Sequence, residues 1–105
     1  MDQFEHLNVA QLQALQQETV VQIVDIRDQQ SFAQGHIPDA FHLTNESLVE
    51  LMNEVAFETP LIVVCYHGIS SQGAAAYFSE KGFKNVSSMV GGFEAWRTVF
   101  PNSVK

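Results

Sequence analysis

The sequence predicts an α/β domain built on a mostly parallel sheet. Strand-like and helix-like segments alternate along its 105 residues, which is the pattern of strand–helix–strand units. Two short segments, residues 20–26 and 61–64, are almost entirely apolar and rich in β-branched side chains, as strands buried on both faces are. The length favours one domain covering residues 1–105, and a hydrophobic content of 46% is sufficient for its core.

Cap residues and apolar spacing define the first elements. Asn8 is a helix cap, and the strand at 20–26 follows that helix. The apolar face of the helix consists of Val9, Leu12 and Leu15. Asp28 is the cap of a short helix that ends near Gly35.

The middle of the chain contains a turn at 36–39, a short strand at 40–43 and a third helix. Thr44 or Asn45 is the expected cap of that helix. Its apolar face consists of Leu48, Leu51, Met52 and Val55, at helical spacing.

A strand–loop–helix unit follows Pro60. The buried strand at 61–64 runs directly into Cys65, a loop occupies 66–70, and a helix begins near Ser71. Further along, we expect a helix end at Lys81 and Gly82, a strand at 86–89, a turn at Gly91 and Gly92, and a closing helix stopped by Pro101. The apolar stripe of the closing helix consists of Phe93, Trp96 and Phe100, which indicates core packing.

The charge of the chain excludes several classes of partner. Five Lys and Arg residues stand against twelve Asp and Glu residues, for a net charge of −7. Nucleic acids and anionic membranes both require a basic surface, so we expect neither as a partner. The single cysteine excludes an intramolecular disulfide, and the N-terminus lacks the pattern of a secretion signal. We therefore expect a cytoplasmic protein.

Cys65 is the candidate nucleophile because of its place in the predicted fold. Ligands of open α/β sheets collect where a parallel strand ends and a helix begins. A short loop there directs several backbone N–H groups toward one point, and the helix N-terminus adds about half a positive charge. Both features stabilise a thiolate or a persulfide, so we expect the pKa of Cys65 to lie below that of a free thiol.

The composition of the loop decides between two interpretations of this cysteine. A lone Cys after an apolar strand is often only a small buried hydrophobic residue. Here, however, the residues that follow suit an anion cradle. Gly68 fits a position with positive φ or a close backbone approach, and Ser70 and Ser71 can cap the helix and donate hydroxyl hydrogen bonds. The four histidines and Cys65 do not have the spacing of a metal site, so we expect no metal and no cofactor.

Three sequence blocks, in this order, resemble the rhodanese family. They are Asp-Ile-Arg with Gly-His-Ile-Pro-Asp-Ala within 25–40, Leu-Ile-Val-Val-Cys-Tyr-His-Gly-Ile-Ser-Ser at 61–71, and Gly-Gly-Phe-Glu-Ala-Trp at 91–96. Within the family, the chain is most similar to single-domain bacterial thiosulfate sulfurtransferases of the glycerol-3-phosphate regulon type. The resemblance implies a three-layer domain with a five-stranded, mostly parallel sheet flanked by helices.

The resemblance also implies the site. Cys65 would be catalytic, and the substrate and persulfide loop would consist of Tyr66, His67, Gly68, Ile69, Ser70 and Ser71. Related phosphatases have a loop one residue longer that ends in an arginine for phosphate, whereas Ser71 stands at the end of this loop. Two-domain thiosulfate sulfurtransferases carry basic side chains after the cysteine, but this chain has Tyr66 and His67. We therefore expect weaker thiosulfate binding or a different physiological donor.

Arg27 has two interpretations. It either steers an anionic donor toward the loop or pairs with an acidic residue of the first block, and we favour the structural pair. We also interpret Asp25 and His36 as structural.

The predicted reaction is a double displacement through a Cys65 persulfide, from thiosulfate to cyanide or a thiol. The partners are then a small-molecule sulfur donor and acceptor, with a thioredoxin-like dithiol protein as a further candidate acceptor. Three rival functions are also consistent with the sequence: a persulfide carrier for a sulfur-trafficking pathway, a non-catalytic rhodanese-like interaction module, and a Cys-dependent phosphatase or arsenate reductase.

Overall fold

A computed structural model describes residues 4–105 and contains one five-stranded sheet. Its strands are β1 (Glu5–Leu7), β2 (Gln22–Asp25), β3 (Phe41–His42), β4 (Leu61–Val64) and β5 (Val86–Met89). The order in the sheet is β1-β5-β4-β2-β3, and each neighbouring pair is parallel. The α/β fold with a parallel sheet, predicted from the sequence, is confirmed.

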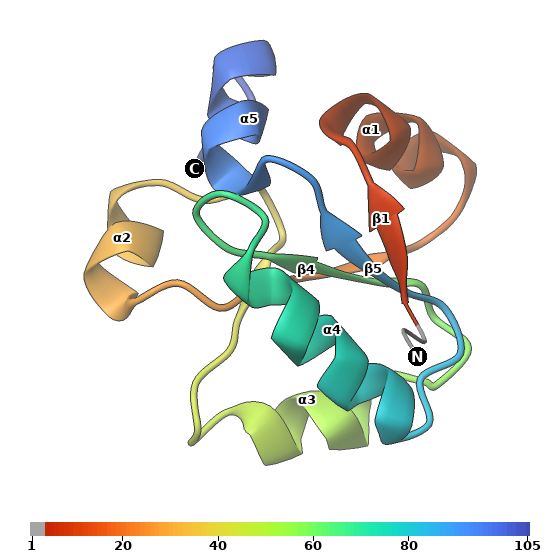
Figure 1. The fold of residues 1–105 in the computed structure, drawn as a ribbon. Helices are drawn as coiled ribbons and strands as arrows, with labels where there is room; N and C mark the ends of the chain where they lie inside the picture. Colours follow the sequence, from red (N-terminus) through yellow and green to blue (C-terminus); the bar gives the residue numbers. More distant parts are fainter. Residues whose placement is uncertain (1–3) are drawn as a thin grey trace.

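Helices cover both faces of the sheet (Figure 1). They are α1 (Val9–Glu18), α2 (Gln29–Gln34), α3 (Leu48–Glu54), α4 (Ser70–Glu80) and α5 (Gly92–Val99). In Figure 1, α3 and α4 lie on one face and α1 and α5 on the other. None of the helices within residues 4–105 has the length and apolarity needed to cross a membrane.

The central strand β4 supplies both hydrophobic cores because its side chains alternate between the two faces. Leu61 and Val63 belong to the cluster that includes Leu51 of α3 and Phe78 of α4. Ile62 and Val64 belong to the opposite cluster, which includes Leu12 of α1 and Trp96 of α5. All four residues of β4 are buried, which is the reason that its sequence is continuously apolar.

Two of the predicted helix caps are confirmed. The Asn8 side chain accepts a hydrogen bond from the N–H of Gln11 at 2.8 Å, and the Gln11 side chain accepts one from the N–H of Asn8. The Asp28 carboxylate accepts from the N–H of Ser31 at 3.1 Å, and α2 ends at Gly35 as predicted.

The strand β2 is shorter than the predicted strand at 20–26. The N–H of Gln22 donates to the Pro60 carbonyl at 2.9 Å, and the register pairs Gln22 with Leu61. Pro60 has no N–H with which to extend the ladder, so pairing between β2 and β4 begins there. Val20 lies outside the strand and is 81% exposed.

The predicted cap of α3 is wrong. Ser47 occupies the cap position of α3, because Thr44 and Ser47 bond to each other in the preceding turn. The N–H of Thr44 donates to Ser47 Oγ at 2.8 Å, and the N–H of Ser47 donates to Thr44 Oγ1 at 3.1 Å.

The strand β1 is not among the strands predicted from the local sequence pattern. It has only three residues at the sheet edge, two of them exposed, so it carries no apolar pattern.

Candidate active site

Cys65 lies directly after β4, at the carboxyl edge of the sheet, and the loop that follows it leads into α4. Only 3% of Cys65 is exposed, whereas Tyr66, His67 and Ile69 of the loop are exposed. The sulfur therefore sits at the base of the loop, and the loop side chains surround its mouth.

Hydrogen-bond donors converge on the sulfur atom. The N–H of Gly68 donates to Cys65 Sγ at 3.1 Å, and the hydroxyl oxygen of Ser71 lies 3.3 Å from Sγ. The backbone N–H groups of His67 and Ser71 also point at the sulfur. The loop thus forms the amide cradle that the strand–loop–helix pattern predicts.

The cradle controls the pKa of Cys65. Burial is the largest single influence and raises this pKa, because it removes water from the charged thiolate. Four hydrogen bonds lower it: one from the Ser71 side chain and three from the backbone N–H groups of Ser71, His67 and Gly68. Together they outweigh burial, so the pKa of Cys65 lies below its ordinary value.

The first turn of α5 orients the loop. The N–H of Phe93 donates to the Cys65 carbonyl at 2.8 Å, and the N–H of Glu94 donates to the Tyr66 carbonyl at 3.2 Å. Because a peptide unit is planar and trans, a Tyr66 carbonyl held toward α5 turns the N–H of His67 the other way, toward the sulfur. The free N–H of Glu94 at the start of α5 therefore fixes the direction of the His67 amide.

Two glycines permit this close packing. Gly68 has φ +85°, and a Cβ there would lie 2.8 Å from the backbone of Met89 and Gly91. Gly92 has φ +60°, and a Cβ there would lie 2.5 Å from the Cys65 carbonyl oxygen. The prediction that Gly68 occupies a positive-φ position with close backbone approach is confirmed.

Two buried serines form a chain of hydrogen bonds that leads from the sulfur into the sheet. Ser71 Oγ lies 2.7 Å from Ser88 Oγ, and both residues are buried, with 0% and 1% exposed. When Cys65 is ionised, the Ser71 hydroxyl can donate to sulfur while Ser88 donates to Ser71. The sequence analysis missed Ser88, because no local pattern places the strand expected at 86–89 beside β4.

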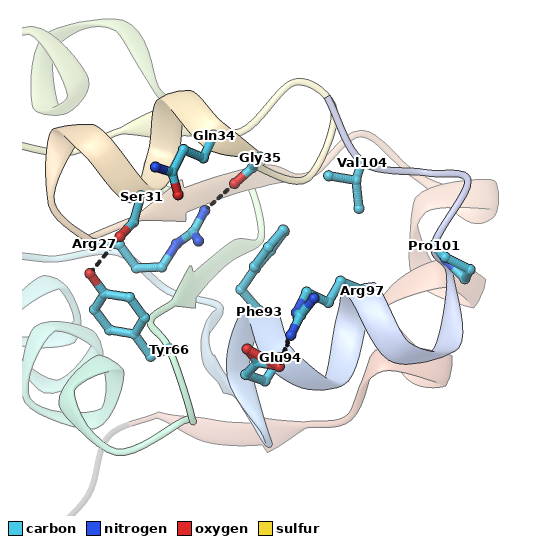
Figure 2. Close-up of a pocket in the computed structure, with 10 residues that line it drawn as sticks. All are labelled: Arg27, Ser31, Gln34, Gly35, Tyr66, Phe93, Glu94, Arg97, Pro101 and Val104. Atoms are coloured by element: carbon cyan, nitrogen blue, oxygen red, sulfur yellow. Dashed lines mark hydrogen bonds and ion pairs between the residues drawn. The ribbon is translucent and has the colours of Figure 1, made fainter.

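The remaining loop side chains are exposed, and none of them is among the groups that bond to the sulfur. The Tyr66 hydroxyl bonds to the Asp28 carboxylate and lies 2.9 Å from Ser31 Oγ, at the start of α2 (Figure 2). The Ile69 side chain is 75% exposed, and Ser70 is exposed. The expectation that Ser70 or Ser71 caps α4 is wrong, because Ile69 occupies the cap position and makes no side-chain cap.

Arg27 is buried and held by several contacts. Its guanidinium bonds to both carboxylate oxygens of Asp25, the shortest contact being 2.8 Å, and its Nη2 donates to the Gly35 carbonyl at 2.7 Å. Its guanidinium carbon lies 4.0 Å from the centroid of the Phe93 ring. Through these contacts Arg27 connects β2 with the end of α2 and with α5. The proposed role of Arg27 in steering an anionic donor stays a prediction.

His36 and His42 both stack on the ring of Phe32. Their ring centroids lie 3.9 and 4.5 Å from the centroid of that ring. A nitrogen of each ring lies within hydrogen-bond distance of a backbone carbonyl, of Phe32 and Arg27 respectively. Within residues 4–105, no group of three His, Cys, Asp or Glu residues is placed to hold a metal ion.

A comparison with models of known protein families identifies the family of this chain. The sequence model of the Rhodanese family, described as the rhodanese-like domain, matches residues 8–98. The chain belongs to the rhodanese-like family. A rhodanese-like domain protein from Staphylococcus aureus is 26% identical, with a TM-score of 0.77, over 89% of this chain and 91% of that one. The glycerol-3-phosphate regulon type stays a prediction.

Two further solved structures are similar. A Rhodopseudomonas palustris protein of unknown function, named as a possible tyrosine phosphatase, is 29% identical with a TM-score of 0.78, over 91% of this chain and 81% of that one. The reduced CoADR-RHD of Bacillus anthracis is 22% identical with a TM-score of 0.80, over 96% of this chain and 18% of that one. The similarity to the Bacillus anthracis protein shows only that the two chains share the rhodanese-like fold.

Proposed function

We propose that the protein is a thiosulfate sulfurtransferase that moves sulfane sulfur to cyanide or a thiol through a persulfide on Cys65. The observation that carries the proposal is the convergence of the Gly68, His67 and Ser71 donors on Sγ, which lowers the pKa of Cys65. Such fixed donors stabilise negative charge on a thiolate and on the terminal sulfur of a persulfide.

The reaction has two displacements. The Cys65 thiolate attacks the sulfane sulfur of thiosulfate; an S–S bond forms at Sγ, and the S–S bond of thiosulfate breaks to release sulfite with its electron pair. In the second step the acceptor attacks the outer sulfur, and the bond between that sulfur and Sγ breaks. Cyanide leaves as thiocyanate, a thiol leaves as a persulfide, and Cys65 returns as the thiolate.

Phosphatase chemistry is the second candidate, because one of the similar structures is named as a possible tyrosine phosphatase. The residue at the end of this loop, Ser71, is fully buried and bonds to sulfur and to Ser88. A bidentate grip on phosphate oxygens requires a guanidinium at such a place. This serine favours transfer of a sulfur atom over transfer of a phosphoryl group.

Loading by thiosulfate tests the proposal. The protein is incubated with thiosulfate and the intact chain is weighed, before and after cyanide is added. We expect a mass gain of one sulfur atom, its loss to cyanide with release of thiocyanate, and no gain in Cys65→Ser. A persulfide carrier would load and lose its sulfur in the same way, because it differs only in its acceptor, whereas loading that cyanide does not remove would contradict the proposal.

The same samples distinguish a sulfurtransferase from an interaction module and from a phosphatase. A non-catalytic module would gain no mass, and a phosphatase would hydrolyse an aryl phosphate without loading. Ser70→Ala is the control variant, because Ser70 is exposed and its hydroxyl is not among the groups that contact sulfur.

A further inference from the structure

Ser88 of β5 carries a buried hydroxyl that the two displacements do not use. It is 1% exposed and lies on the same face of the sheet as Val86, whose side chain packs in the cluster with Ala75 and Phe78. Its neighbour across the sheet is Val63, of the same cluster. A hydroxyl in such apolar surroundings costs free energy unless it is hydrogen-bonded. The bond that it makes therefore indicates what this serine does.

That bond joins Ser88 to Ser71, which also contacts the sulfur. The two Oγ atoms lie 2.7 Å apart, and the Ser88 side chain has no other hydrogen-bond partner within the described residues. The further partner of Ser71 Oγ is Cys65 Sγ, at 3.3 Å. Because a buried O–H without an acceptor is costly, the Ser88 hydrogen points at Ser71 Oγ. The Ser71 hydrogen cannot occupy the same line between the oxygens, so it is left for the sulfur.

The hydrogens of this chain suit a charged sulfur. One link joins Sγ to Ser71 Oγ, another joins Ser71 Oγ to Ser88 Oγ, and each hydroxyl supplies the hydrogen for one of them. A thiol brings a third hydrogen, for which neither link has room, whereas the thiolate adds none. Of the hydrogen bonds that lower the pKa of Cys65, the one from the Ser71 side chain has the largest influence. The direction of the Ser71 hydroxyl therefore matters to the nucleophile.

We propose that Ser88 is a positioning residue, which directs the Ser71 hydroxyl at Sγ and so favours the charged form of Cys65. Its role in sulfur transfer rests on the proposed function, whereas its role in ionisation does not. Without Ser88, the Ser71 hydroxyl can rotate toward a carbonyl of the preceding turn, as serines within helices often do. The bond to the sulfur also loses the polarisation that a donor behind it provides.

A substitution at Ser88 leaves every charge around Cys65 in place. The first turn of α4 and the strands β4 and β5 contain no charged residue. The charged and titratable groups on the other elements around Cys65 are Tyr66 and His67 of the loop, Asp25 and Arg27 at the end of β2, and Glu94 of α5. A change in the titration of Cys65 therefore reports on the hydrogen-bond chain.

The titration of the unloaded protein tests the proposal. Thiolate absorbance is followed against pH for Ser88→Ala, as the difference from the same variant carrying Cys65→Ser. We expect a thiol about two- to tenfold less acidic, with a midpoint higher by about 0.3 to 1 pH unit. Adding Ser88→Ala to Ser71→Ala should raise the midpoint no further, because Ser88 acts only through that hydroxyl. An unchanged or lower midpoint in Ser88→Ala, or additive shifts in the double variant, overturns the proposal.

Matched variants separate the hydroxyl from the volume of the side chain. Ser88→Thr keeps a hydroxyl, and Ser88→Val has nearly the same shape without one. We expect Ser88→Thr to titrate close to the wild type and Ser88→Val to titrate like Ser88→Ala. Ser87→Ala is the neighbouring control, because the Ser87 side chain lies on the opposite face of β5, and its midpoint should not change. Equal midpoints in Ser88→Thr and Ser88→Val contradict the proposal.

Loading by thiosulfate distinguishes this role from the proposed function. We expect Ser88→Ala to load more slowly than the wild type at pH values below its own midpoint, and at a similar rate well above it. If no variant loads, the proposed function fails, while the titration still decides the role of Ser88. Normal loading with an unchanged midpoint overturns the role of Ser88 and leaves the proposed function intact.

Discussion

A single sulfur atom receives contacts from the loop and from the first turn of α4. Cys65 and Gly68 could be identified from the sequence because a nucleophile at a strand end and a glycine after it have local causes. Ser88 could not, because its contact with Ser71 depends on how β5 lies beside β4. Of the two adjacent serines, only Ser71 bonds to the sulfur, and the direction of each side chain is set by where α4 begins.

Ser71→Ala tests the side-chain part of the cradle. Its hydroxyl lowers the pKa of Cys65, so its removal raises that pKa and leaves less thiolate at neutral pH. A hydrogen bond to a charged group contributes about 1.5–3 kcal/mol, so we expect loading by thiosulfate at pH 7 to fall roughly tenfold or more. The rate should recover as pH rises. An unchanged pH profile in Ser71→Ala, with Ser70→Ala as the neighbouring control, would contradict this role.

At the scale of elements, capping chemistry could be predicted and contacts between elements could not. The caps Asn8 and Asp28 act on their own helices, and both predictions are confirmed. The predicted cap of α3 is wrong, because Thr44 and Ser47 each accept a hydrogen bond from the other's N–H in the turn before the helix. The docking of α5 on the Cys65 carbonyl joins residues far apart in the chain, and no local pattern indicates it.

Two glycine substitutions test this docking. Gly92→Ala places a methyl group against the backbone of Cys65 and Tyr66, and an alanine with positive φ alone costs about 1–2 kcal/mol. We expect a lower free energy of unfolding by at least that amount, with loss of loading. Gly73→Ala is the control: it lies in α4 with open space around it, so alanine should stabilise by about 0.5–1 kcal/mol. Chemical denaturation of both variants measures the difference, and equal stabilities would refute the docking contact.

At the scale of the whole molecule, the parallel sheet separates two hydrophobic cores and presents Cys65 at its carboxyl edge. The continuous apolar sequence of β4 predicts burial on both faces, and the two clusters confirm it. The order of the strands does not follow from any local pattern, since the edge strand β1 pairs with the last strand β5. The place of Ser88 near the site likewise depends on this order, because β5 lies beside β4 and its Ser88 pairs with Val63, two residues before Cys65.

The charge state of the free protein gives the most direct test of the account. The ultraviolet absorbance of the thiolate is titrated against pH, as the difference between the wild type and Cys65→Ser. The cradle amides and Ser71 predict a midpoint below that of cysteine in a short unstructured peptide. A midpoint at or above the peptide value would mean that burial outweighs the hydrogen bonds, and would contradict the account.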